Sequence, residues 1–162
     1  MIHHTQYKML CSAGIDLGSA IQAPAQIRMP IVFMSESQLP GVGQHVYLSQ
    51  AMASQAILHR TQALRYTNRL VALAKCALGQ GMPVTNKGTS CEEYPFASSY
   101  EGGIGGTVAK VPPKSNSGQG GVLSAFYRFC DVVPEVFPLN EFVVVPVASA
   151  PVSFQCRRFG NR

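Results

Sequence analysis

The segment from Ser49 to Leu78 contains neither glycine nor proline, although the 162-residue chain has 15 glycines and 11 prolines. Apolar residues recur along this segment at intervals of seven, which is typical of an amphipathic helix that buries one face. Ser49 is a suitable N-cap and Gly79 a suitable C-terminal stop. The pattern therefore predicts a long helix over 49–78, interrupted at most once. The recurring apolar positions are Ile57, Leu64, Val71 and Leu78.

The chain beyond Gly79 differs in composition, since 11 of the 15 glycines lie from this residue onward. Short runs rich in β-branched and other apolar residues predict strands over 31–34, 104–111 and 142–145. Pro146 is expected to end the regular pairing of the last strand, because proline has no backbone N–H.

A second helix is predicted over 119–131, where apolar residues recur at helical spacing, after a loop over 112–118. The expected fold class is α+β: a long N-terminal helix, then a small antiparallel sheet that carries the second helix. A chain of 162 residues is expected to form one compact domain. Within it we distinguish an N-terminal extension over 1–48, packed on the rest, from a main part over 49–162.

The net charge of +5 is unevenly distributed along the chain. No acidic residue occurs between Glu36 and Glu92, and this interval contains basic residues throughout its second half. A basic surface beside a group of carboxylates suits a polyanionic substrate and a metal or proton-transfer centre, so nucleic acid is a candidate partner. Many basic proteins bind no nucleic acid, and that alternative remains open.

The chain has five cysteines, an odd number, without a C-x-x-C pair, and this spacing does not suit a zinc site. Cys76 and Cys91 either close a short disulfide loop in an oxidising compartment or remain buried thiols.

No run is apolar enough to span a membrane, so no membrane partner is expected. No secretory signal is visible at the start of this sequence.

The densest polar cluster runs from Ser90 to Gly103 and holds three of the eight acidic residues. Adjacent side chains of an extended chain point to opposite sides, so Glu92 and Glu93 are not expected to face one site together. A solvated turn that happens to contain two glutamates is the ordinary alternative to a functional role.

Five separated blocks occur in order between residues 91 and 127. They read Cys-Glu-Glu-Tyr-Pro-Phe-Ala-Ser from Cys91, Glu-Gly-Gly from Glu101, Val-Pro-Pro from Val111, Asn-x-x-Gln-Gly-Gly from Asn116, and Phe-Tyr from Phe126. With Asn68, Arg69 and Cys76 upstream, they resemble the bacterial NucA/NucB-type deoxyribonuclease family over roughly residues 60–147. The family usually has aspartate at the position of Glu92.

The resemblance implies a small endonuclease of the ββα-metal type, in which two strands and a helix surround one divalent cation, Mg²⁺ or Mn²⁺. It also implies that the acid pair replaces the catalytic histidine of related nucleases, so Glu92 and Glu93 are the expected catalytic residues. The resemblance makes Asn116 the expected metal ligand, with an Asx turn that caps the helix as its alternative role. Glu101 and Gln119 are expected to complete the metal shell together with water.

Phosphodiester hydrolysis requires an activated water, a cation near the developing charge and assistance to the leaving oxygen. A carboxylate can supply the first requirement and one hard cation the other two. Polar and basic side chains around these sites are expected to contact phosphate groups of the substrate. These are Lys110, Lys114, Ser115, Arg128, Arg65 and Arg69. For the last two, which share a helix face, a solvated surface is the alternative. None of the four histidines is assigned to catalysis.

We therefore expect a nonspecific, metal-dependent DNA endonuclease. The resemblance implies a secreted protein, and with no signal peptide visible we expect the toxic part of a larger exported antibacterial effector that is delivered into a target cell. A cognate immunity protein is then expected as a second partner besides DNA. A secreted scavenging nuclease is the alternative origin, and an inactive nucleic-acid-binding module of the same fold is the alternative function. A metal-independent ribonuclease is disfavoured because the sequence has no clear pair of catalytic histidines.

Overall fold

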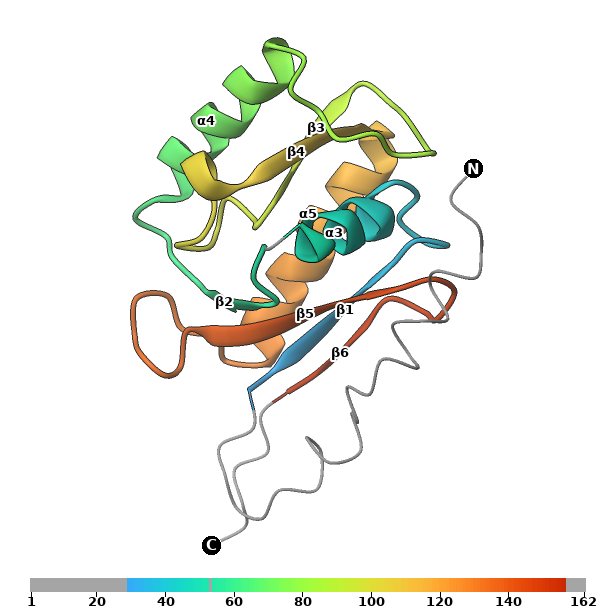
Figure 1. The fold of residues 1–162 in the computed structure, drawn as a ribbon. Coiled ribbons are helices and arrows are strands. Elements are labelled where there is room, and N and C mark those ends of the chain that lie inside the picture. Colours follow the sequence, from blue (N-terminus) through green and yellow to red (C-terminus); the bar gives the residue numbers. More distant parts are fainter. Residues whose placement is uncertain (1–28, 53, 157–162) are drawn as a thin grey trace, which may run out of the picture. The chain divides into compact units, whose positions relative to one another are not determined.

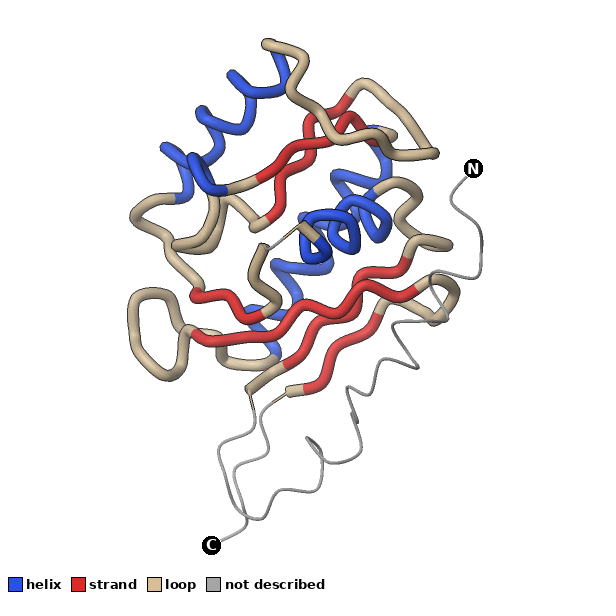
Figure 2. The backbone as a smooth tube through the Cα atoms, viewed as in Figure 1, coloured by secondary structure: helices blue, strands red, loops and turns tan. Residues whose placement is uncertain are grey.

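The computed structural model describes residues 29–52 and 54–156, which form an α+β unit (Figure 1, Figure 2). Its helices are α3 (Val42–Ala51), α4 (Arg65–Ala77) and α5 (Pro113–Phe129), with a short 3-10 helix η1 (Gly103–Gly105). Its strands are β1 (Ile31–Ser35), β2 (Ile57–His59), β3 (Ser90–Tyr94), β4 (Thr107–Val111), β5 (Glu141–Val147) and β6 (Ser153–Gln155). The expected α+β class is confirmed.

The strands form two sheets within the described residues. A four-stranded mixed sheet has the order β2-β5-β1-β6, with β1 parallel to β5 and both outer strands antiparallel to their neighbours. The second sheet is the antiparallel pair β3–β4, in which Glu92 lies opposite Ala109. The predicted strands over 31–34 and 142–145 are therefore confirmed as parts of β1 and β5.

Helices α3 and α5 lie between the two sheets, and α4 covers the other face of the β3–β4 pair (Figure 1). The main hydrophobic core occupies the space between the sheets, and its largest fully buried side chains are Tyr94, Phe126 and Phe142. A smaller apolar cluster, which includes Ala72 and Val108, joins α4 to the pair. The chain passes from β3 through β4 directly into α5, so the expected strand–strand–helix order is present.

The predicted long helix over 49–78 is wrong. Helix α3 ends at Ala51, the chain then forms β2, and α4 begins only at Arg65. In β2, Ile57 pairs with Val143 of β5, so its backbone groups find partners in another strand rather than within a helix. Long-range pairing has thus overridden the local helical pattern.

The start of the second helix also differs from the prediction. Helix α5 begins at Pro113, within the segment 112–118 that was expected to be a loop. Proline fits the first position of a helix, because the N–H that it lacks would have no partner there. The earlier start places Asn116 and Gln119 on one helix. The strand expected over 104–111 begins at Thr107, since η1 precedes it.

Strand β5 continues through Pro146, contrary to the expectation that this proline ends its pairing. The N–H of Val144 bonds to the carbonyl of Ala56 on the β2 side, and alternate residues of a strand direct their N–H groups to the same side. The nitrogen of Pro146 faces this same side, but β2 pairs only with residues 141–143 of β5 and does not extend as far as Pro146. On its other side Pro146 stays paired with Met34 of β1. The missing N–H therefore costs no ladder hydrogen bond.

The described residues form two disulfides, Cys76–Cys91 between α4 and β3, and Cys130–Cys156 after α5. Cys76 and Cys91 thus form a disulfide and are not buried thiols, which were the two alternatives that the sequence left open.

Residues 1–28 of the predicted extension, and Cys11 with them, lie outside the described residues, and position 48 falls inside α3. Among the described helices, none combines the length and hydropathy that a membrane span requires.

Candidate active site

A cavity of about 650 Å³ lies beside β3 and is lined by residues of α4, β3 and α5. Positions on α5 that are three or four residues apart form one of its walls, because they share a helix face. These are Asn116, Gln119, Gly120, Leu123, Ser124, Tyr127 and Arg128. Three more arginines line the cavity besides Arg128 of α5: Arg60, Arg65 and Arg69. The cavity is therefore strongly basic.

The cavity brings together part of the predicted site. Of the predicted residues, Glu93, Asn116, Gln119, Arg65, Arg69 and Arg128 line it. The structure does not bring Glu92, Glu101, Lys110, Lys114 or Ser115 to its wall.

Glu93 is the carboxylate of the cavity. Its side chain is 12% exposed and forms an ion pair with Arg69 of α4. Burial raises the pKa of the Glu93 carboxyl above its ordinary value, Arg69 opposes this shift, and the neighbouring Glu92 adds to it. A carboxylate whose pKa is raised toward neutrality is better suited to accept a proton from water.

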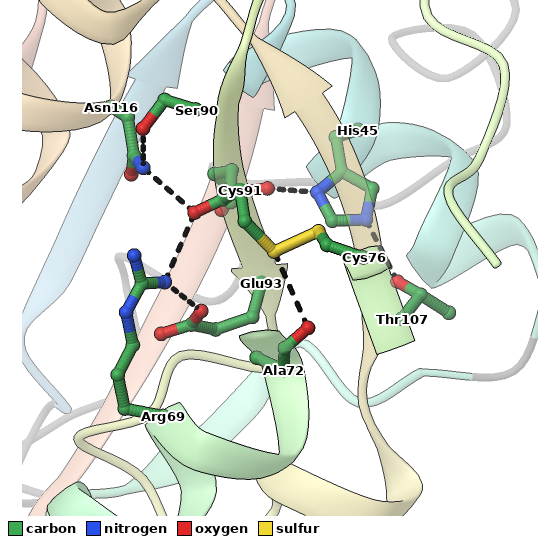
Figure 3. The surroundings of a disulfide bond; sticks show 10 residues. His45, Arg69, Ala72, Cys76, Ser90, Cys91, Glu93, Thr107 and Asn116 are labelled. Atoms are coloured by element: carbon green, nitrogen blue, oxygen red, sulfur yellow. Dashed lines mark hydrogen bonds and ion pairs between the residues drawn. A yellow bond between two sulfur atoms is a disulfide. The ribbon is translucent and has the colours of Figure 1, made fainter. Parts of the chain in front are cut away.

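Asn116 is held against the backbone of β3 (Figure 3). Its Nδ2 donates to the hydroxyl of Ser90 at 2.7 Å and to the carbonyl of Cys91 at 2.8 Å. Because a carbonyl only accepts, the amide nitrogen must face β3, and the oxygen Oδ1 remains for a ligand. Asn116 lies inside the first turn of α5, and the N-cap of this helix is Pro112 without a side-chain cap. Asn116 therefore does not cap α5 through an Asx turn, which was its alternative role.

Glu92 points away from the cavity into the core, on the side of β3 opposite to Glu93, as the alternation of an extended chain predicts. Its side chain is fully buried. One oxygen, Oε1, accepts from Nε2 of Gln119 at 2.9 Å, and the other contacts Nδ1 of the buried His45. Glu92 therefore has no surface available to a substrate.

The other four residues that lie off the cavity have different surroundings. Glu101 is bound to His59, accepting from its backbone N–H at 3.1 Å and contacting its Nδ1 at 2.6 Å. Ser115 is buried, whereas Lys110 and Lys114 are exposed outside the cavity. A phosphate inside the cavity would not contact these residues.

Arg60 and Tyr127 belong to the cavity but were not predicted. The guanidinium of Arg60 lies 4.5 Å from the centre of the Tyr127 ring, and the hydroxyl of Tyr127 contacts that of Ser98 at 2.9 Å. Burial raises the pKa of Tyr127 to about 12, so its hydroxyl stays protonated. Tyr127 belongs to the Phe126-Tyr127 block of the family resemblance, which could have indicated it. The only sequence feature that pointed to Arg60 was its position in the basic interval between Glu36 and Glu92.

The oxygen donors of the cavity suit a hard divalent cation. They include the carboxylate of Glu93 and the amide oxygens of Asn116 and Gln119, whose nitrogens are engaged elsewhere. Across residues 29–52 and 54–156, no group of three or more His, Cys, Asp or Glu side chains is arranged to hold a metal. A cation that would be held by neutral oxygens and several waters, next to one carboxylate, matches the preference of Mg²⁺, not of zinc.

A family described as deoxyribonuclease NucA/NucB matches residues 49–134, more than half of the chain. The matched range contains α4, the β3–β4 pair, α5 and every residue that lines the cavity. His45 lies before it. Among curated proteins, none matches the chain.

Proposed function

The chain belongs to the NucA/NucB deoxyribonuclease family, and we propose that it hydrolyses DNA phosphodiester bonds in the arginine-lined cavity with one bound divalent cation, Mg²⁺ or Mn²⁺. The family implies deoxyribonuclease activity and a DNA substrate. The observation that carries the proposal is the meeting of one partly buried carboxylate, Glu93, with the amide oxygens of Asn116 and Gln119 in a basic cavity.

In this proposal Glu93 accepts a proton from the attacking water, because it is the only carboxylate among the described residues that line the cavity. Asn116 and Gln119 would hold the cation. A bound cation would supply charge stabilisation at the scissile phosphate and at the leaving oxygen. Arg69 holds Glu93 in place through their ion pair.

Arg60, Arg65 and Arg128 are proposed to hold phosphates on either side of the scissile bond. A guanidinium binds phosphate oxygens in a bidentate manner, and contacts to the backbone carry no sequence information. This supports cleavage with little sequence preference. The cavity has a volume of about 650 Å³ and is lined mainly by charged, amide and hydroxyl side chains. It therefore suits a short stretch of DNA backbone better than an apolar ligand.

We also propose that the chain acts outside the cytoplasm of its producer, as an exported toxin domain. The two disulfides support an oxidising compartment, since such bonds rarely persist in a reducing cytosol. A cognate immunity protein remains a proposed partner. Tyr66, Leu70 and Leu73 expose an apolar face of α4 beside basic residues, which would suit an acidic inhibitor.

Incubation of the purified chain with supercoiled plasmid tests the function. Nicked and linear products are expected with Mg²⁺ or Mn²⁺, and none with EDTA. Glu93→Gln is expected to abolish most of the cleavage, whereas Asp131→Asn, the same chemical change at an exposed residue outside the cavity, is the matched control. DNA binding without cleavage under every condition would favour the inactive module instead.

A further inference from the structure

A chain of buried polar contacts runs from α3 to the wall of the cavity. Nδ1 of His45 contacts Oε2 of Glu92, and Oε1 of Glu92 accepts from Nε2 of Gln119 at 2.9 Å. His45 and Glu92 are both completely buried, and Gln119 is 6% exposed. Because Gln119 also lines the cavity, this chain of contacts connects the core with the candidate site.

The inner end of the chain is fixed as well. Nε2 of His45 contacts the hydroxyl of Thr107 at 2.9 Å, which in turn contacts the hydroxyl of Ser49 at 2.6 Å. Every polar atom of the His45 and Glu92 side chains thus has a partner. Burial of two ionisable groups is unfavourable unless they are paired, and apolar side chains of similar size are often at least as stable in such a position. Stability alone therefore does not account for the pair.

The pair determines the orientation of the Gln119 amide. A hydrogen bond between Nδ1 of His45 and Oε2 of Glu92 uses one proton, and whichever of the two atoms donates it, Oε1 remains an acceptor. An acceptor at this position requires the nitrogen of the Gln119 amide to face Glu92. The amide oxygen is then the atom left for the cavity.

We propose that His45 and Glu92 are positioning residues, which hold Gln119 with its amide oxygen turned toward the bound cation. This inference rests on the proposed function, in which Gln119 is a cation ligand. His45 acts from α3, outside the range 49–134 that matches the family, so the site extends beyond the matched segment. Partners that orient a metal ligand typically change metal affinity or activity by about 10–100-fold when they are removed.

Two variants of His45 distinguish the positioning of Gln119 through Glu92 from a contribution of His45 to folding alone. In His45→Asn the amide nitrogen replaces Nδ1 and keeps a donor toward Glu92. In His45→Gln the amide nitrogen replaces Nε2, which keeps the contact with Thr107 and loses the one with Glu92. Both variants remove the ring, so similar losses of thermal stability are expected. Gln50→Leu is the matched control on α3, because Gln50 bonds to Tyr94 and Val144 and not to Glu92.

Three readouts apply to each folded variant: kcat and KM on DNA, Mg²⁺ affinity by calorimetry, and hydrogen exchange of the Gln119 side-chain amide by NMR. His45→Gln is expected to lower kcat and Mg²⁺ affinity about 10-fold or more, with little change in KM, and to speed amide exchange. His45→Asn and Gln50→Leu are expected to stay close to the parent in all three. Equal behaviour of the two His45 variants would overturn the proposal.

The exchange measurement on the parent protein needs no variant and no catalytic activity. A slowly exchanging Gln119 side-chain amide is expected, and exchange as fast as that of an exposed glutamine would overturn the inference. Absence of cleavage by the parent, with a protected amide and normal Mg²⁺ binding, would overturn the proposed nuclease function and leave the positioning role intact.

Discussion

Arg69 of α4 forms an ion pair with Glu93 of β3, and its Nη1 also donates to the carbonyl of Cys91 at 3.0 Å. The same carbonyl accepts from Nδ2 of Asn116 at 2.8 Å (Figure 3). One backbone oxygen therefore connects α4 and α5 to the strand that carries the carboxylate. Since Arg69 is engaged in this way, we assign phosphate binding mainly to the other arginines of the cavity.

Replacement of the cavity carboxylate tests its proposed role as the base. Glu93→Gln is expected to lower kcat for DNA cleavage by at least about 100-fold, while the overall shape of the site is kept. Cleavage by the variant at the parental rate would show that Glu93 is structural.

The pH dependence of cleavage should reflect the same group. Burial raises the pKa of the Glu93 carboxyl. A base acts when ionised, so kcat should fall as the pH decreases through this raised pKa, at a higher pH than for an ordinary glutamate. The pH–rate profile measures this, and the acidic limb should be missing from the residual activity of Glu93→Gln. A limb that persists there belongs to another group.

Asn116→Ala removes a proposed cation ligand. Cleavage should be lost and Mg²⁺ affinity, measured by calorimetry, should weaken. The loss of two hydrogen bonds to β3 should also lower the free energy of unfolding by about 1–2 kcal/mol. Ser90→Ala removes one of these bonds without touching Oδ1, so it should reduce stability slightly and keep cleavage. Unchanged Mg²⁺ affinity in Asn116→Ala would remove this residue from the metal shell.

The arginines of the cavity should govern the salt dependence of DNA binding. In Arg65→Gln/Arg128→Gln, affinity should fall for all sequences alike, and the slope of log K against log salt should decrease by about one to two units. Titration of a labelled duplex at several salt concentrations measures both quantities. Lys87→Gln changes a charge at an exposed position outside the cavity and serves as the control. An unchanged slope in the double variant would assign these arginines to a solvated surface.

The Cys76–Cys91 disulfide closes a loop with a sequence separation of 15 residues next to the site. The double variant Cys76→Ser/Cys91→Ser should lower the free energy of unfolding by about 3 kcal/mol, chiefly because its unfolded chain is less constrained. Urea denaturation of oxidised protein gives this difference. Equal midpoints for the parent and the variant would contradict it.

Glu135 should make stability depend on pH. The N–H of Ala63 lowers the pKa of the Glu135 carboxyl, as do the hydroxyl of Thr61 and the N–H of Gln62. The stabilisation is present above the pKa of the unfolded chain, about 4.3, and is lost as the pH falls through the lower folded value. Glu135→Gln should therefore reduce Tm at neutral pH and match the parent at strongly acidic pH. A difference that persists in acid would have another cause.

Local sequence determined several features of this protein correctly. The β-branched runs predicted β1 and β5, because such residues fit a buried pleated strand whatever lies beside it. Alternation along an extended chain predicted that Glu92 and Glu93 point to opposite sides. The blocks from Cys91 to Tyr127 identified the family, and they contain Glu93, Asn116 and Gln119 of the cavity.

Only the tertiary structure decided which side of β3 faces the cavity and which faces the core. Alternation of side chains along a strand separates Glu92 from Glu93 but does not say which of the two is buried. Pairing of Ile57 with Val143 turned a helical pattern into a strand, because partners far apart in the sequence satisfied its backbone. His45 contacts a residue 47 positions away, and no local spacing connects the two. The sequence therefore determined β1, β5 and the family, while long-range packing decided where the helices begin and end, which acid faces the cavity and which is buried against a histidine.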